Sequence, residues 1–187
     1  MDTIMEATAQ VLERSGNDNF TTNHIAVRSG FSIGTLYRYF PHKKAILRAM
    51  VEAALQRQEQ KMREILAPEG AASADEIIEL VVGVVMEPFV SRSRVRKRML
   101  MGLISEADLV AKTNMANMQM MRLVQQRLAE IDPNRYREPT DLSCRMLIGT
   151  MLGNIRTTLF IDDEYLHEPA FKQELVELVT HIVAAKG

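Results

Sequence analysis

Apolar residues recur three and four positions apart along almost the whole chain, and this spacing permits little other than α-helix. The alternation that marks a strand never persists for more than a few residues. We therefore predict an all-α fold of about nine helices. The expected helices cover approximately residues 3–14, 22–28, 33–40, 42–66, 74–87, 94–106, 109–130, 140–160 and 169–185.

Individual residues predict where several of these helices begin and end. The side chains of Thr21 or Thr22 and of Ser32 can cap the free amides of a helix start. Gly30 suits the left-handed turn that closes a helix. Pro88 is expected to separate the fifth helix from the sixth, because proline cannot continue the backbone hydrogen bonds.

Composition limits the class of protein. The 187 residues are 47% hydrophobic, enough for a real core, but no apolar run is long enough to span a membrane. A single cysteine, Cys144, excludes an intramolecular disulfide and cannot anchor a zinc cluster. The start, Met1-Asp2-Thr3, lacks the features of a secretion signal. We expect a cytoplasmic protein with no cofactor, no metal site and no membrane partner.

The charge is unevenly distributed. From residue 19 to residue 51 there is no acidic residue, and five cations make the segment +5. Since the whole chain carries −1, the remainder carries −6. Such asymmetry is typical of a module that faces phosphate, although a solvated basic face is an equally simple alternative.

Two short helices joined at Gly30 fit a helix-turn-helix. In the second of them, Leu36 and Phe40 share a face suited to a core. Thr35, Tyr37, Arg38 and Tyr39 are left for the outside, together with Gly34, which would let the backbone approach DNA closely. Exposed hydroxyls and a guanidinium are groups that reach phosphates and base edges, so these side chains favour DNA.

One ordered pattern runs through this segment. It reads Thr21-Thr22-(two residues)-Ile25-Ala26-(two)-Ser29-Gly30-Phe31-Ser32-Ile33-Gly34-Thr35-Leu36-Tyr37-Arg38-Tyr39-Phe40-(two)-Lys43. The pattern resembles the DNA-binding domain of the TetR family of transcriptional regulators. The close match covers residues 1 to about 50, and the rest resembles the family only in helical pattern and length.

The resemblance implies roles for individual residues. Thr22 would hold a phosphate, Lys43 would anchor the DNA backbone, and Lys44 would add non-specific attraction. The complete predicted DNA-binding set is Thr22, Ser32, Ile33, Gly34, Thr35, Tyr37, Arg38, Tyr39, His42, Lys43 and Lys44. It also implies a helix-turn-helix DNA-binding domain over residues 1–48 and a helical effector-binding and dimerisation domain over residues 49–187.

Two further sites follow from the resemblance. Family members pair their last two helices into an intersubunit bundle, which predicts a homodimer interface at Gly149, Gly153, Phe171, Leu175, Leu178, Val179 and Ile182. Their central helices enclose an effector cavity, and methionine suits a promiscuous apolar pocket. A small apolar effector is therefore expected among Phe89, Met99, Leu103, Met118 and Met121, although the same spacing also fits ordinary core.

A dense basic run covers residues 92–98. It could add phosphate contacts, grip an anionic ligand, or form only a solvated helix start, and the sequence favours the last by a little. The helix from His42 to Leu66 is expected to be the only link between the DNA-binding module and the rest. Its pivot would move Lys43 and the recognition helix together.

The expected function is that of a sequence-specific DNA-binding regulator, a repressor released from its operator by a small molecule. One alternative is an architectural DNA-binding protein without an effector. The other is a helical-bundle enzyme, which the sequence disfavours because it lacks paired carboxylates, a nucleophile with its base, and a metal cluster.

Overall fold

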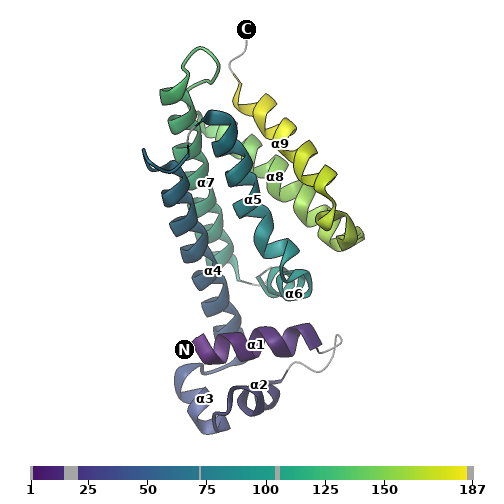
Figure 1. The fold of residues 1–187 in the computed structure, drawn as a ribbon. Coiled ribbons are helices and arrows are strands. Elements are labelled where there is room, and N and C mark those ends of the chain that lie inside the picture. Colours follow the sequence, from purple (N-terminus) through teal and green to yellow (C-terminus); the bar gives the residue numbers. More distant parts are fainter. Residues whose placement is uncertain (1, 15–20, 72, 104–105, 185–187) are drawn as a thin grey trace.

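The computed structural model describes residues 2–14, 21–71, 73–103 and 106–184, with the side chains of 102 and 103 left out. Its described residues form nine α-helices and one 3-10 turn (Figure 1). The helices are α1 (Asp2–Arg14), α2 (Thr22–Ser29), α3 (Ile33–Tyr39), α4 (Lys43–Leu66), α5 (Ala74–Val90), α6 (Ser93–Leu103), α7 (Ala107–Ile131), α8 (Asp141–Ile161) and α9 (Pro169–Val183), with η1 (Asp163–His167) before the last. The predicted all-α fold is confirmed. No helix in these ranges is both long and apolar enough to cross a membrane.

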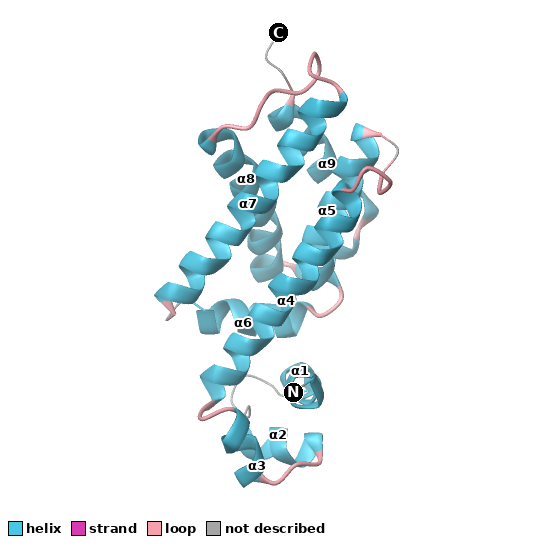
Figure 2. Cartoon of the chain, turned by 90° about the vertical axis from the view of Figure 1, so that its left-hand side faces the viewer, coloured by secondary structure: helices cyan, strands magenta, loops and turns pink. Residues whose placement is uncertain are grey.

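Helices α1 to α3 form a small module at the lower end of the molecule, and α4 rises from it into a larger helical body (Figures 1 and 2). The expected caps are present. The Thr21 side chain accepts a hydrogen bond from the His24 amide at 3.3 Å, and Ser32 accepts one from the Thr35 amide at 3.0 Å. Between them Gly30 takes a left-handed conformation with φ of 74°, which turns the chain from α2 into α3.

The buried apolar side chains form two clusters. The lower cluster centres on Ile25, Leu36 and Ile46, which are fully buried where α2, α3 and α4 meet. It extends beyond the first fifty residues, because Val95 of α6 and Leu109 of α7 also belong to it. The lower module therefore shares its core with the first turns of the body.

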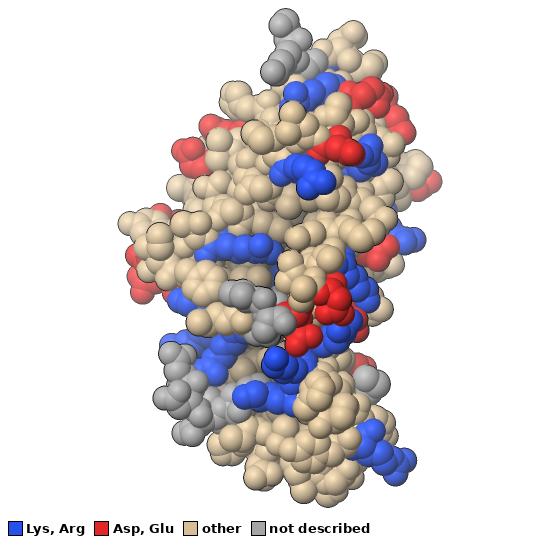
Figure 3. All heavy atoms as spheres, turned by 180° about the vertical axis from the view of Figure 1, so that it is seen from behind, with Lys and Arg blue, Asp and Glu red and all other residues tan. Residues whose placement is uncertain are grey.

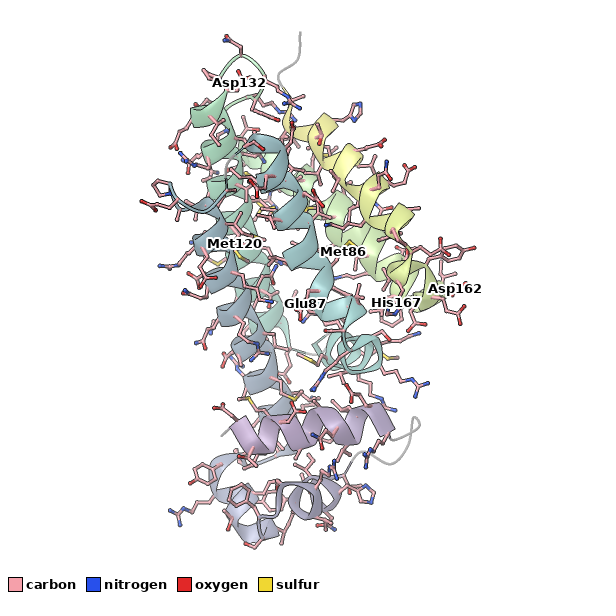
Figure 4. The ribbon with its side chains drawn as sticks, viewed as in Figure 1. Met86, Glu87, Met120, Asp132, Asp162 and His167 are labelled. Atoms are coloured by element: carbon pink, nitrogen blue, oxygen red, sulfur yellow. The ribbon has the colours of Figure 1, made fainter. Side chains whose placement is uncertain are left out.

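The upper cluster fills the body between α5, α7, α8 and α9. Figure 4 marks two of its members, Met86 on α5 and Met120 on α7, both buried. Cys144 is fully buried in the same cluster, and burial raises the pKa of its thiol. Cys144 thus occupies the position of a small apolar residue.

The expectation that Pro88 separates two helices was wrong. Helix α5 continues to Val90, with Pro88 inside its last turn. The missing amide of Pro88 costs one backbone hydrogen bond. Phe89, directly after it, is only 1% exposed, and burial of this ring in the core offsets that loss.

Helix α4 is not the only link between the module and the body, contrary to expectation. Helix α6 packs against α1. Arg92, just before α6, donates two hydrogen bonds to the Glu6 carboxylate at 2.9 and 3.1 Å and lies 3.3 Å from a Glu13 oxygen. These hydrogen bonds hold the pKa of Glu6 below its ordinary value. A displacement of α6 would therefore act directly on α1.

We expect Gly30→Ala to lower the free energy of unfolding by about 1–2 kcal/mol, since an L-residue resists the left-handed conformation. A Cβ at this position meets nothing within 4 Å, so the cost comes from the backbone alone. Urea denaturation measures it. Gly34→Ala is the matched control: its Cβ would meet only the Ser32 Oγ at 3.9 Å, and stability should stay constant or rise slightly. Equal losses in both variants would contradict the argument.

Candidate nucleic-acid interface

Helix α3 presents two opposite faces. Leu36 and Phe40 are buried in the lower cluster, as predicted. Tyr37 and Tyr39 are 46% and 52% exposed, and Ile33 is 39% exposed. Aromatic and branched side chains left in water on a short helix are costly for a monomer. Their exposure indicates a face that is completed by a partner.

The outer face of α3 is held in place by local hydrogen bonds. The hydroxyl groups of Ser32 and Thr35 lie 2.9 Å apart, and the Ser32 oxygen also caps the helix. The hydroxyl of Tyr37 lies 3.0 Å from that of Thr22 at the head of α2. The ends of two different helices thus form one hydroxyl-bearing surface, and Gly34 adds no side chain to obstruct it.

The basic residues beyond α3 differ in their surroundings. His42 caps α4, because its Nδ1 accepts a hydrogen bond from the Ala45 amide at 3.0 Å. Lys43 follows at the exposed first position of α4. Lys44 lies 3.6 Å from Glu106, next to the body, which weakens the attraction to phosphate expected of it.

In the view from behind, the described residues at the lower tip of the molecule include Lys and Arg but no Asp or Glu (Figure 3). This agrees with the acid-free segment in the sequence. Arg38 is exposed at the end of α3, whereas Arg28 turns to α1 and donates to Gln10 at 2.6 Å. A positive, hydroxyl-rich convex surface with exposed aromatic rings is suited to the groove of duplex DNA.

The residues predicted to line an effector pocket do not meet in one cavity. Phe89 and Met121 are buried in the upper cluster, and Met118 packs against it. Met99 belongs to the lower cluster. The side chain of Leu103 lies outside the described residues.

A cavity of about 510 Å³ lies instead where α1, α4, α5 and α6 meet. Met99 is the one predicted pocket residue among the side chains that line it. Met5, Met50, Val84 and Val95 add to its apolar wall. Lys61 of α4 and Glu87, labelled near the lower end of α5 in Figure 4, face each other across its edge at 3.9 Å.

The basic run at residues 92–98 divides among several surroundings. Arg92 pairs with α1, and Lys97 lies 5.2 Å from the centre of the Phe160 ring. Arg94 is exposed. Arg96 instead lines the cavity, with its guanidinium carbon 4.7 Å from the centre of the Phe89 ring. A solvated helix start therefore describes only part of this run.

The predicted dimer residues fall into two groups. Gly149 and Gly153 are exposed on α8, with nothing of the chain near an added Cβ, and Leu178 is 44% exposed. Leu175 and Val179, by contrast, are buried in the upper cluster of their own chain. These two were wrongly assigned to an outer face, because α9 buries one side against α5 and α8. Phe171 and Ile182 are partly buried against the same cluster.

The structure adds residues that sequence reasoning missed. Leu142, Met146 and Phe160 of α8 are 70%, 55% and 42% exposed and lie on the same side of the helix as Gly149 and Gly153. Their spacing with the two glycines, in steps of three, four and seven, is the signal that could have found them. Helix α8 therefore carries an exposed apolar stripe with a flat centre.

The lower module matches a known family in sequence. Residues 4–50 match the sequence profile of the bacterial regulatory proteins of the tetR family. Over nearly the whole chain, the sequence is similar to the HTH-type transcriptional regulator UidR of Escherichia coli strain K12. The two are 26% identical, over 97% of this chain and 92% of the relative.

Solved structures share the complete architecture. The transcriptional regulator FadR from Bacillus subtilis, in complex with stearoyl-CoA, has a TM-score of 0.78 at 18% identity, over 97% of this chain and 98% of that one. SmeT, the repressor of the Stenotrophomonas maltophilia multidrug efflux pump SmeDEF, has a TM-score of 0.71 at 20% identity, over 100% and 91%. Residues 4–50 thus form a helix-turn-helix domain of the type found in the tetR family, and the chain is a DNA-binding transcriptional regulator.

Proposed function

We propose that this regulator is a repressor that inserts α3 into the major groove of its operator. The observation that supports this most directly is the acid-free surface on which the hydroxyl groups of Thr22 and Tyr37 meet. Ser32, Ile33, Gly34, Thr35, Arg38 and Tyr39 belong to the same surface. Lys43 contacts phosphate beside it, with His42 and Lys44 at its margin. Residues 1–48 serve as the DNA-binding domain in the cytoplasm, and residues 49–187 bind effector and partner.

The regulator works as a homodimer that joins through the exposed stripe of α8 and the outer side of α9. Gly149 and Gly153 allow a second helix to approach closely, and Leu142, Met146 and Phe160 supply apolar area. A two-fold dimer places its two recognition helices about 34–36 Å apart to read one turn of DNA, or further apart for a longer operator.

A small molecule in the cavity between α1, α4, α5 and α6 releases the operator. Its volume of about 510 Å³ lies within the range of ligand pockets. Structures similar to this one have been solved with stearoyl-CoA and, in the case of SmeT, with triclosan. A ligand in this cavity touches α1 and α4 together, so it contacts the lower module and the body at once.

The operator is obtained by selecting bound sequences from random DNA. Tyr37→Ala should then weaken operator binding by about 1–3 kcal/mol, provided that its contacts include a base edge. Lys43→Ala should weaken binding to all DNA sequences alike. It should also reduce the slope of affinity against salt concentration by the equivalent of about one phosphate contact. Titration at several salt concentrations separates the two. Unchanged affinity in both variants would exclude α3 from the interface, and a selection without enrichment would favour an architectural role.

The dimer interface is tested by Gly149→Leu. A branched side chain at a close helix crossing should dissociate the dimer, whereas the monomer gains no clash because the position is open within its own chain. Asn154→Leu, exposed on α8 but outside the stripe, is the matched control. Sedimentation equilibrium measures the change. A folded Gly149→Leu variant that remains dimeric would place the interface elsewhere.

Release of the operator implies a reciprocal effect. Any compound that lowers operator affinity tenfold corresponds to a coupling of about 1.4 kcal/mol, and the operator must weaken the binding of that compound by the same factor. Calorimetric titration of the compound into free protein and into the operator complex checks this relation. Equal affinities would refute release through a shared equilibrium.

A further inference from the structure

Among the described residues, Arg96 is a charged side chain without a counter-ion. It lines the 510 Å³ cavity from α6, and its Nε is buried without a hydrogen-bond partner. Arg92, one turn earlier on the same side, has two carboxylate partners. Within the described chain, no acidic side chain forms an ion pair with Arg96. The guanidinium of Arg96 instead lies over the ring of Phe89.

A second arginine adds to the imbalance. Arg156 of α8 also has a buried Nε without a partner and forms no ion pair in the described ranges. Helices α6 and α8 are in contact, and burial and then the positive charge of Arg156 lower the pKa of Arg96 to about 10. Burial lowers the pKa of Arg156 too. Two partly buried cations, neither ion-paired within the described ranges, therefore act on each other, and Arg96 is the one that lines the cavity.

The acidic groups around the cavity do not neutralise this pair. Glu6 is held by Arg92 and Gln10, and Glu87 lies 3.9 Å from Lys61. Asp2, at the exposed start of α1, is the remaining acid of the lining. An unpaired buried charge is strongly unfavourable, whereas a paired and hydrogen-bonded one is tolerated.

We propose that the cavity binds an organic oxyanion with an apolar body, whose carboxylate or phosphate is held by Arg96, while Arg156 of α8 adds positive charge from beyond the lining. A guanidinium offers parallel donors that match either group. Met5, Met50, Val84, Val95 and Met99 surround the apolar part. DNA phosphate is excluded as the occupant, because a duplex is too large for a cavity of 510 Å³.

This inference rests on the proposed effector function and narrows the effector from any small apolar molecule to an amphipathic anion. An anion bound at Arg96 would pull on α6, whose first turn follows Arg92. Since Arg92 holds Glu6 and Glu13 of α1, the same ligand would act on the lower module. The charged head thus provides both affinity and a direct route to the DNA-binding helices.

The test uses octanoate, octyl phosphate and 1-octanol as probes, titrated into the full-length protein without DNA. We expect at least one anion to bind tenfold or more tightly than the alcohol. Arg96→Met should remove this preference while leaving 1-octanol binding unchanged. Its Tm without ligand should stay constant or rise, because an unpaired buried charge is replaced by an apolar side chain. Arg94→Met, an exposed position on the same helix, is the control and should keep the preference.

A preference for octanoate identifies a carboxylate ligand, and a preference for octyl phosphate identifies a phosphate. Arg156→Met provides a second reading if Arg96→Met does not fold. The proposal is overturned if the three probes bind equally, if anion binding survives both substitutions, or if both substitutions lower the Tm. Anion binding without operator release would contradict the release function alone. Release by 1-octanol without anion binding would contradict this inference alone.

Discussion

The fold depends on one helix that belongs to two cores. Ile46 and Met50 of α4 are buried in the lower cluster, and Met62 is buried in the upper one. The 24 residues of α4 extend about 36 Å at 1.5 Å per residue, so one rigid element spans the joint between the parts. Because both cores bury the same helix, neither core can reorient without moving the other.

The joint is reinforced by contacts that are individually weak. Arg92 meets Glu6 and Glu13, Arg48 meets Asp108 at 2.8 Å, and Lys44 meets Glu106. Exposed ion pairs contribute little to stability, and salt screens them. These ion pairs instead determine the register of the joint, since they fix which turn of α6 and α7 faces α1 and α4.

The cavity lies at this joint, between the shared helix and α6, and not in the centre of the body. Apolar packing closes the body around Val82, Val124 and Leu147, which are fully buried. At the joint the bulky cation Arg96 occupies a site where a complete core would require an apolar side chain.

Much of the lower module could be predicted because its signals are local. Thr21, Gly30 and Ser32 act on amides or dihedrals within three residues, and Leu36 and Phe40 follow from helical period alone. The resemblance added the roles of Thr22 and Lys43, which no periodicity reveals. For the body, the sequence predicted the helices but not the position of the cavity. The apolar stripe of α9 was recognised, yet the side of it that faces inward was not, so Leu175 and Val179 were misassigned.

The sequence by itself determined the helical class, the limits of most helices, the helix-turn-helix and its polar face. These depend on spacing and capping within a few residues, which the chain carries in any context. The tertiary structure alone decided that Pro88 stays inside α5, that α6 holds α1, and that Arg96 lies unpaired beside a cavity. Each depends on which distant residue arrives as a neighbour. In the sequence Arg96 is one cation in a basic run, and only the tertiary structure buries its Nε and places its guanidinium over the Phe89 ring.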